Sequence, residues 1–342
     1  MRLPLPWLLT LTTAALALLL VGSLATGPMS LSFGESLRAL FAGQQSGIEA
    51  HKLLIVQEIR LPRTLLCIAV GAILGLCGAV MQGLFRNPLA DPGIIGVSGG
   101  AALGAALAIV LLAPLSQQWQ SLLGIGLLPL LAFLGGALTT TLVYLLGTRE
   151  GGTSVTVMLL AGVAITALSG AVLGLLTYLA DDQMLRNLSL WQMGSLAAGK
   201  PVDVALALLT LAALLILFLR DANPLNALLL GEGEARHLGI QVQSLKRRLI
   251  LLTAAGVGVA VAVAGMIGFV GLVVPHLVRL LAGPNHVRLL PLSALLGAGL
   301  LLGADMLART LLAPAELPVG IITALMGAPF FIWLLVKSRR TL

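Results

Sequence analysis

One segment of the sequence has the spacing of a serine nucleophile. Gly96-Val97-Ser98-Gly99-Gly100 fits the G-x-S-x-G pattern, in which a sharp turn exposes a reactive serine. Such a serine needs a base within hydrogen-bond reach, and among the four histidines only His276 lies in an apolar stretch. Pairing of Ser98 with His276 would make an intramembrane serine protease. The alternative is a packing seam, because glycines that flank a serine in a membrane helix let another helix approach closely.

Two acidic residues near the ends of apolar stretches could carry protons. Asp305 and Glu316 would be proton relays if the chain were a proton-coupled secondary transporter. Asp305 lies beside Arg309, so a structural ion pair is the plainer interpretation.

Three arginines lie at the ends of apolar runs that are predicted to share one side of the membrane. Arg60 and Arg63 bracket Pro62 before one run, and Arg309 follows another. Arginine presents planar, permanently charged donors that suit the carboxylates of a partner protein. The alternative is that these residues extend to lipid headgroups, as flanking arginines commonly do.

The composition indicates that these residues belong to a membrane protein. Of the 342 residues, 58% are hydrophobic and only 10% are charged, far below the roughly 25% charged residues of a soluble domain. The net charge of +7 does not indicate nucleic-acid binding, because the basic residues fall in short clusters between apolar runs. The two cysteines, Cys67 and Cys77, share one apolar run and predict neither a disulfide nor a metal site.

The apolar runs predict ten membrane-spanning helices in a single domain over residues 1–342, since a bilayer requires about 20 apolar residues per helix. The first run is long for a cleaved signal peptide and is interpreted as a span. The apolar stretch from 249 to 282 is too long for one span and must turn around Gly265 or Gly268. The predicted spans are Trp7–Thr26, Thr64–Phe85, Ile94–Leu112, Leu122–Leu146, Ser154–Leu179, Val202–Leu219, Leu249–Met266, Ile267–Leu281, Leu289–Leu307 and Val319–Val336.

The distribution of basic residues predicts the orientation. Ten spans put both termini on one side, and thirteen of the 20 Lys and Arg residues fall on that side, against seven on the other. Because positive charge concentrates in cytoplasmic loops, both termini are expected in the cytoplasm.

Small residues recur four apart within the predicted spans. This spacing predicts close helix packing, either inside the chain or at a homodimer seam. The pairs are Gly71/Gly75, Gly100/Gly104, Gly170/Gly174 and Gly299/Gly303.

Two cytoplasmic connections stand out. The segment Leu84–Gly93 contains two prolines and an asparagine, which predict a stiff turn that is either a simple loop or the lip of a gate. The longest connection, residues 220–248, contains a short helical pattern that ends at Gly239. In this pattern Glu232 and Glu234 lie near the start, and Ala235 and Leu238 lie on one face. It suits either a docking element for a cytoplasmic partner or a helix lying on the bilayer.

Several ordered motifs resemble the permease family of type II ABC importers that take up vitamin B12, ferric siderophores and haem. The resemblance runs from about residue 55 to the C-terminus. It rests on Arg60-Leu-Pro-Arg63-Thr-Leu, Gly78-Ala-Val-Met-Gln82, Asn87-Pro-Leu-Ala-Asp-Pro-Gly93, Trp191-Gln-Met-Gly194-Ser, Gly265-Met-Ile-Gly-Phe-Val-Gly-Leu-Val-Val-Pro-His276, Ala304-Asp-Met-Leu-Ala-Arg309 and Glu316-Leu-Pro-Val-Gly320.

The resemblance implies an all-α polytopic membrane protein of the bacterial inner membrane, with ten spans per subunit and a homodimer around a translocation path. Its implied partners are two cytoplasmic ATPase subunits, a periplasmic substrate-binding protein and the lipid bilayer. The chain itself would catalyse no reaction and hold no permanent cofactor or metal, since ATP would bind the partner subunit.

The same resemblance assigns roles to residues of this chain. Arg60, Arg63 and Arg309 match arginines that receive acidic residues of the binding protein. The coupling helix that meets the ATPase matches Gly231, Glu232, Glu234, Ala235, Leu238 and Gly239. The cytoplasmic gate matches Asn87, Pro88 and Leu89 together with Val155 and Thr156 at the start of the fifth span.

The segment between Tyr178 and Ser195 is most similar to the haem-uptake branch of the family. Haem is therefore the expected cargo, with a ferric siderophore or vitamin B12 as alternatives.

Overall fold

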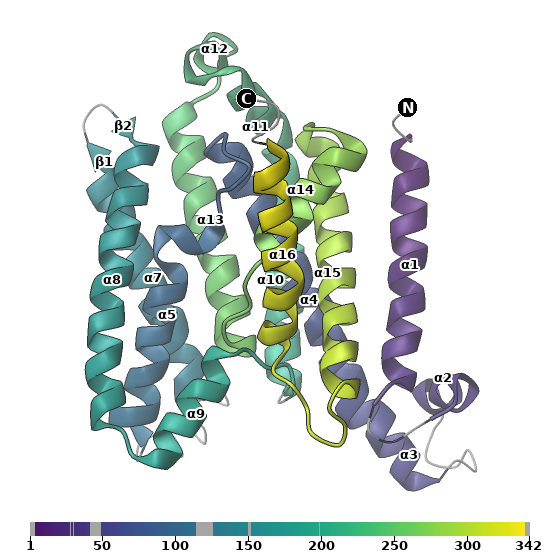
Figure 1. Ribbon diagram of the computed structural model, residues 1–342. Coiled ribbons are helices and arrows are strands. Elements are labelled where there is room, and N and C mark those ends of the chain that lie inside the picture. The colour runs from purple at the N-terminus through teal and green to yellow at the C-terminus, as the bar shows by residue number, and fades with distance from the viewer. Residues whose placement is uncertain are drawn as a thin grey trace.

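The chain forms a bundle of roughly parallel long helices with short helices at both ends (Figure 1). The computed structural model describes residues 4–27, 29, 31–41, 49–113, 126–149, 152–197 and 199–338. The ten principal helices are α1 (Leu5–Ala25), α4 (Leu61–Leu84), α5 (Val97–Ala106), α7 (Leu127–Gly147), α8 (Val155–Leu179), α10 (Pro201–Arg220), α13 (Val242–Ala264), α14 (Val270–Ala282), α15 (His286–Thr310) and α16 (Val319–Ser338).

Short elements connect these helices. One connection contains a short antiparallel hairpin in which β1 and β2 have two residues each, and the sequence did not predict it. The short elements are α2 (Phe33–Phe41), α3 (Ala50–Leu54), η1 (Ile55–Arg60), η2 (Pro92–Ile95), η3 (Leu107–Leu111), β1 (Thr148–Arg149), β2 (Gly152–Thr153), α9 (Asp182–Gln192), α11 (Ala222–Leu230) and α12 (Glu232–His237).

Each predicted span coincides with one principal helix. Within the described residues, seven helices are long and apolar enough to cross a membrane: α1, the continuous α3–η1–α4, α7, α8, α10, α13 and α15. The other three predicted spans are shorter apolar helices over Val97–Leu111, Val270–Ala282 and Val319–Leu334. The start of the predicted span Leu122–Leu146 lies partly outside the described residues. Helix α1 begins, and α16 ends, at the end of the bundle that carries α12 (Figure 1), as the predicted common side of the termini requires.

The third predicted span starts later than expected. Its predicted start was Ile94, but η2 occupies Pro92–Ile95 and α5 begins only at Val97. Gly96 between them has φ +85°, a left-handed conformation that interrupts a regular helix and that glycine adopts readily.

The predicted turn in the long apolar stretch is confirmed at Gly265. Helix α13 ends at Ala264, and Gly265 leaves it with φ +70°. Phe269 has φ +67° and begins α14 in the opposite direction. Because residues 265–269 are not helical, α14 is only 13 residues long.

Helix α4 is the centre of the bundle, in contact with α10, α13, α14 and α15. A Cβ added at Gly71 would collide with the Gly297 carbonyl oxygen, and one at Gly75 with the Ser293 carbonyl oxygen. Both partners lie on α15, so this glycine pair packs inside the chain.

The second glycine pair packs inside the chain as well. A Cβ at Gly100 would collide with the Gly135 carbonyl, and one at Gly104 with the Leu131 carbonyl, both on α7. Close packing of α5 against α7 therefore depends on these glycines.

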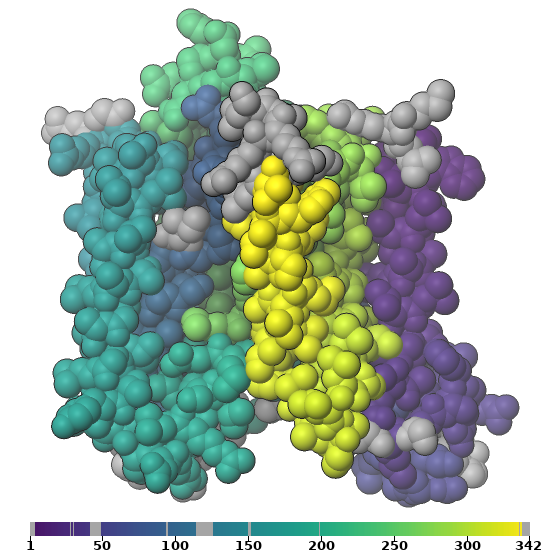
Figure 2. All heavy atoms as spheres, viewed as in Figure 1, coloured from purple at the N-terminus to yellow at the C-terminus, as the bar shows by residue number. Residues whose placement is uncertain are grey.

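Helix α8 lies at the edge of the bundle and is largely uncovered. A Cβ added at Gly170 or Gly174 would meet no atom within 4 Å. Large apolar side chains on the same helix are exposed, with Leu160 at 67% and Val163 at 66%. Figure 2 shows α8 in teal and α16 in yellow standing forward on one face of the molecule, with a hollow between them.

Candidate functional site

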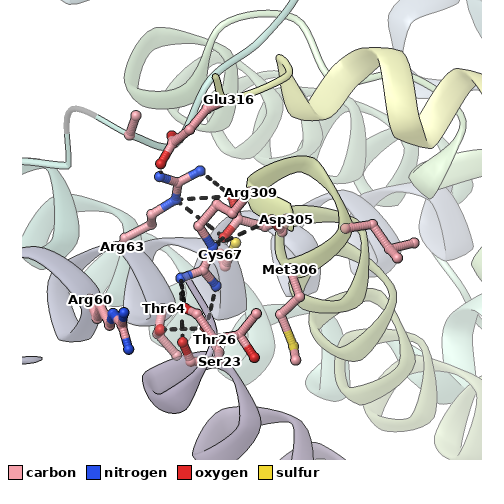
Figure 3. A network of polar contacts seen from close by, with 12 residues as sticks. Ser23, Thr26, Arg60, Arg63, Thr64, Cys67, Asp305, Met306, Arg309 and Glu316 are labelled. Carbon is pink, nitrogen blue, oxygen red and sulfur yellow. Dashed lines mark hydrogen bonds and ion pairs between the residues drawn. The ribbon is translucent and has the colours of Figure 1, made fainter. Parts of the chain in front are cut away.

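A buried network of charged side chains joins helices at the end of the bundle opposite α12. Arg63, near the start of α4, donates from Nε and Nη2 to Asp305 Oδ1 at 3.0 and 2.8 Å. Its Nη1 donates to Glu316 Oε2 at 2.7 Å. Asp305 comes from α15 and Glu316 from the loop before α16, so Arg63 ties three segments together (Figure 3).

The ion pair expected between Asp305 and Arg309 is confirmed. Arg309 Nε lies 3.0 Å from Asp305 Oδ2, one turn away on α15. Arg309 also donates from Nη2 to Ser23 Oγ at 2.8 Å and from Nη1 to the Thr26 carbonyl at 3.1 Å. The network therefore reaches the end of α1 as well (Figure 3).

Arg60 is bound by backbone rather than by carboxylates. Its Nη1 donates to the carbonyl oxygens of Leu24 and Ala25 at 2.7 and 2.9 Å, and its Nη2 to that of Met29. Leu24 and Ala25 end α1, where helix carbonyls lack intrahelical partners and carry partial negative charge. Arg60 thus caps α1.

The network is enclosed within the chain. Arg60, Arg63 and Arg309 are 4%, 6% and 2% exposed, and Asp305 is 0% exposed. The Glu316 side chain, at 34%, is its most exposed carboxylate. Within this network, three arginines against two carboxylates leave one net positive charge. The predicted docking arginines are therefore occupied by internal partners, and their docking role stays a prediction.

The predicted coupling helix forms, although its faces differ from the expectation. Helix α12 follows Gly231, which has φ +122°, and ends where Gly239 turns back with φ +81°, as predicted for its C-terminal stop. Ala235 is fully buried, but Leu238 lies beyond the helix and is 64% exposed. The predicted common face of Ala235 and Leu238 is therefore wrong, because the helix ends one residue before Leu238.

A buried lysine with no predicted role of its own organises the α12 end of the molecule. Lys246 on α13 is 2% exposed. Its Nζ donates to Glu232 Oε1 on α12 at 2.6 Å and to the Thr153 carbonyl at 3.0 Å. Glu232 and Lys246 are 14 residues apart and lie on different helices, so no helical spacing could have paired them.

The predicted gate residues lie at the α12 end of the molecule, in the turn after α4 and in the first turn of α8 (Figure 1). Asn87 Oδ1 accepts from the Leu89 N–H at 2.9 Å, which makes the predicted stiff turn. Asn87, Pro88 and Leu89 are exposed. Val155 and Thr156 form the first turn of α8, which packs against η2, the short helix after the Asn87 turn. The gate role of these residues stays a prediction.

The arrangement around Ser98 does not favour hydrolysis. Among the described residues, no hydrogen bond joins Ser98 to His276, and the His276 Nε2 atom is buried without a hydrogen-bond partner. The His276 ring packs edge-on against Phe330, with ring centroids 6.1 Å apart. A serine without a base is a poor nucleophile. The neighbouring Gly100 serves the packing of α5 on α7 instead.

A cavity lies beside Ser98, among α4, α5, α13 and the non-helical segment before α14. Its volume is about 320 Å³. Most of its lining is apolar, and its polar side chains are Asp91, Ser98 and Gln192.

The fold defines a class of protein, a multi-pass helical membrane protein. Comparison with known proteins gives its family. The FecCD transport family matches residues 15–337. The hemin transport system permease protein HmuU of Yersinia pestis is 47% identical over 95% of this chain and 93% of its own length. The vitamin B12 import system permease protein BtuC of Klebsiella pneumoniae subsp. pneumoniae is 41% identical over 97% and 94%.

A solved structure agrees with this relationship. A metal-chelate type ABC transporter in an inward-facing conformation superposes with a TM-score of 0.83 and 35% identity, covering 97% of this chain and 99% of its own. PsaBC from Streptococcus pneumoniae shares the fold with a TM-score of 0.57 at 20% identity. The chain belongs to the FecCD transport family. It is an ABC transporter permease subunit and not itself an enzyme.

Proposed function

We propose that this chain is the haem permease of an ATP-driven importer in a bacterial inner membrane. The observation that supports haem as the cargo is the 47% identity to the hemin permease over 95% of the chain. Vitamin B12 permeases reach 41% to 44% identity over 87% or more of the chain, so vitamin B12 is the second candidate, and a ferric siderophore the third.

The importer requires a second copy of this chain, and α8 offers the surface for it. Gly170 and Gly174 face away from the rest of the chain, where small residues would let another helix approach closely. In this homodimer α8 lines the path on the dimer axis. Ten spans with both termini in the cytoplasm fit the excess of basic residues at the α12 end.

The two ends of the bundle then meet different partners. Helix α12 protrudes at the cytoplasmic end (Figure 1) and receives one ATPase subunit per protomer. At the periplasmic end, Arg60, Arg63 and Arg309 would receive acidic residues of a substrate-binding protein, and exposed Glu316 lies at the rim. ATP binding and hydrolysis on the partner would move α12 and open the gate at Asn87–Leu89 and Val155–Thr156 by alternating access.

The surroundings of Asp305 argue against a proton-coupled secondary transporter. Arg63 and Arg309 both contact its carboxylate within 3.0 Å. Asp305 is also 0% exposed, so its carboxylate is enclosed in a structural network and does not face a water-filled path, as a proton relay would.

The test is uptake by proteoliposomes that hold this chain with its cognate ATPase and binding protein, the latter loaded in turn with haem, vitamin B12 and a ferric siderophore. Haem uptake that requires both partners supports the proposal. Uptake of only one of the other ligands would overturn haem as the cargo. Transport driven by a proton gradient without ATP would overturn the ATP-driven mechanism.

A further inference from the structure

The hairpin that precedes α8 is fastened to α13 through one residue. The Thr153 N–H donates to Gln243 Oε1 at 2.9 Å, and the Thr153 carbonyl accepts from Lys246 Nζ at 3.0 Å. Gly152, beside it, has φ +114°, and a Cβ there would collide with the Gln243 side-chain amide. Both polar groups of the Thr153 backbone are therefore held by side chains from the first turns of α13.

Lys246 is shared between this hairpin and α12. Its ammonium group is buried and needs both a compensating charge and acceptors for its donors. Glu232 of α12 supplies the charge at 2.6 Å, and Thr153 supplies a second acceptor. A displacement of α12 therefore acts on the same ammonium group that holds Thr153.

Thr153 lies directly before the start of α8. Ser154 is the N-cap of α8, and its Oγ accepts from the Val157 N–H at 3.4 Å. Val155 and Thr156 follow in the first turn. The side-chain link thus ends at the point from which α8 begins.

We infer that Lys246 and Gln243 are positioning residues that transmit movement of α12 to the first turn of α8. This inference rests on the proposed function, in which α12 receives the ATPase and α8 lines the path. Helices α12 and α13 are joined by the chain itself, whereas Thr153 is held to α13 by these two side chains. Breaking the link lets α12 respond to ATP without moving α8.

The first test is Lys246→Met in the complete complex with ATPase and binding protein. Methionine keeps an unbranched apolar stem, and Glu232, whose side chain is 33% exposed, can be hydrated once its partner is lost. We expect ATP hydrolysis to persist while haem transported per ATP falls roughly twofold to thirtyfold. Lys246→Arg, which keeps the charge and donors, should recover part of the loss. A lesion in folding alone would lower complex yield and both activities together.

Arg247→Met is the matched control. Arg247 is the next residue on α13, carries the same charge and is exposed. Its replacement should leave transport per ATP unchanged. If Lys246→Met and Arg247→Met both match the wild type, the inference is wrong and the proposed function stands. If the wild-type complex shows no ATP-dependent uptake, the proposed function fails and the inference fails with it.

A second variant covers the case in which Lys246→Met does not assemble. Gln243→Leu removes the acceptor for the Thr153 N–H without changing charge. Cys67 and Cys77 are 0% exposed, so a cysteine placed at exposed Val157 can be spin-labelled alone. ATP should change the distance between Val157 labels of the two protomers in the wild-type background and change it less in Gln243→Leu. An equal change in both backgrounds would overturn the inference.

Discussion

Helices α4 and α8 are both long and apolar, and each carries a glycine pair, yet they occupy opposite environments. In the most apolar stretch of the α3–η1–α4 helix 89% of the residues are buried, against 17% in α8. The glycines of α4 meet backbone of α15, whereas those of α8 meet nothing within 4 Å. The same small-residue spacing therefore serves packing inside the chain in one helix and remains available to an outside partner in the other.

The polar contacts of the two helices differ in the same way. Arg63 fixes the end of α4 that lies opposite α12 through a carboxylate that is 0% exposed, so the network is sealed inside the chain. At the other end of the molecule, Lys246 binds both the Thr153 carbonyl before α8 and the Glu232 carboxylate on the protruding α12. A helix held by enclosed ion pairs acts as a fixed frame, and one tied to a surface element can be moved by a partner.

The largest effect is expected from breaking the fixed frame at Asp305. Asp305→Asn would leave Arg63 and Arg309 without their shared buried anion, at a cost of about 3–5 kcal/mol in unfolding free energy. Thermal unfolding of the purified protein in detergent measures this loss. Glu316→Gln is the control, because its side chain is 34% exposed and its loss should cost much less. Equal stability of Asp305→Asn and the wild type would show that the network does not hold the frame.

A pair of identical substitutions compares the two helices directly. Gly75→Ala places a Cβ against the Ser293 carbonyl and should destabilise the protein by about 1–3 kcal/mol through overpacking. Gly174→Ala meets no atom and should be neutral or slightly stabilising, since alanine favours a helix. Unfolding midpoints of the two variants give the comparison, and a larger loss at Gly174 would contradict it.

Bulkier residues on α8 should affect assembly rather than folding. Leucine at both Gly170 and Gly174 would block close approach of a second copy, and its Cβ would meet no atom of its own chain within 4 Å. We expect the unfolding midpoint to stay near that of the wild type, while native mass spectrometry shows monomers in place of dimers. Retention of the dimer would mean that α8 does not form the seam.

The smallest effect is expected at a partly exposed ion pair between α2 and α3. Lys52 donates to Glu35 at 2.9 Å and, with hydrogen bonds from Ser32, lowers the pKa of the Glu35 carboxyl from 4.5 to about 2. Because the carboxyl pKa is lowered on folding, the ionised group stabilises the folded state at pH values above its ordinary pKa of 4.5. This contribution is lost as the pH falls from 4.5 towards 2. Because the pair is partly exposed to solvent, Lys52→Met should leave the unfolding midpoint at pH 7 within experimental error. A clear decrease would show that the contact between α2 and α3 contributes to the frame.

Much of the fold was predictable because each membrane span corresponds to a continuous apolar run in the sequence. A turn in the stretch from 249 to 282 followed from its length, since a 34-residue apolar stretch is too long for one span, and its glycines placed the turn at Gly265 or Gly268. The later start of α5 was missed because η2 and the left-handed Gly96 look apolar in sequence.

The sites were predicted less completely because they depend on contacts distant in the sequence. Arg63 and Asp305 are 242 residues apart, so the burial of the three arginines could not be inferred from their positions beside apolar runs. The link through Lys246 was missed because the unpredicted hairpin supplies its second acceptor. The face on which Leu238 lies was predicted wrongly because α12 ends at His237. Gly239, with its left-handed backbone, ends the helix just before Leu238, and such an end cannot be placed to within one residue from sequence.

The most direct test of the account is ATP-driven haem uptake by proteoliposomes that contain this chain with its ATPase and binding protein. Uptake should occur with ATP, stop with a non-hydrolysable analogue, and be unaffected when the proton gradient is collapsed. Haem accumulation driven by a proton gradient without ATP, or no haem uptake by an active complex, would contradict the account.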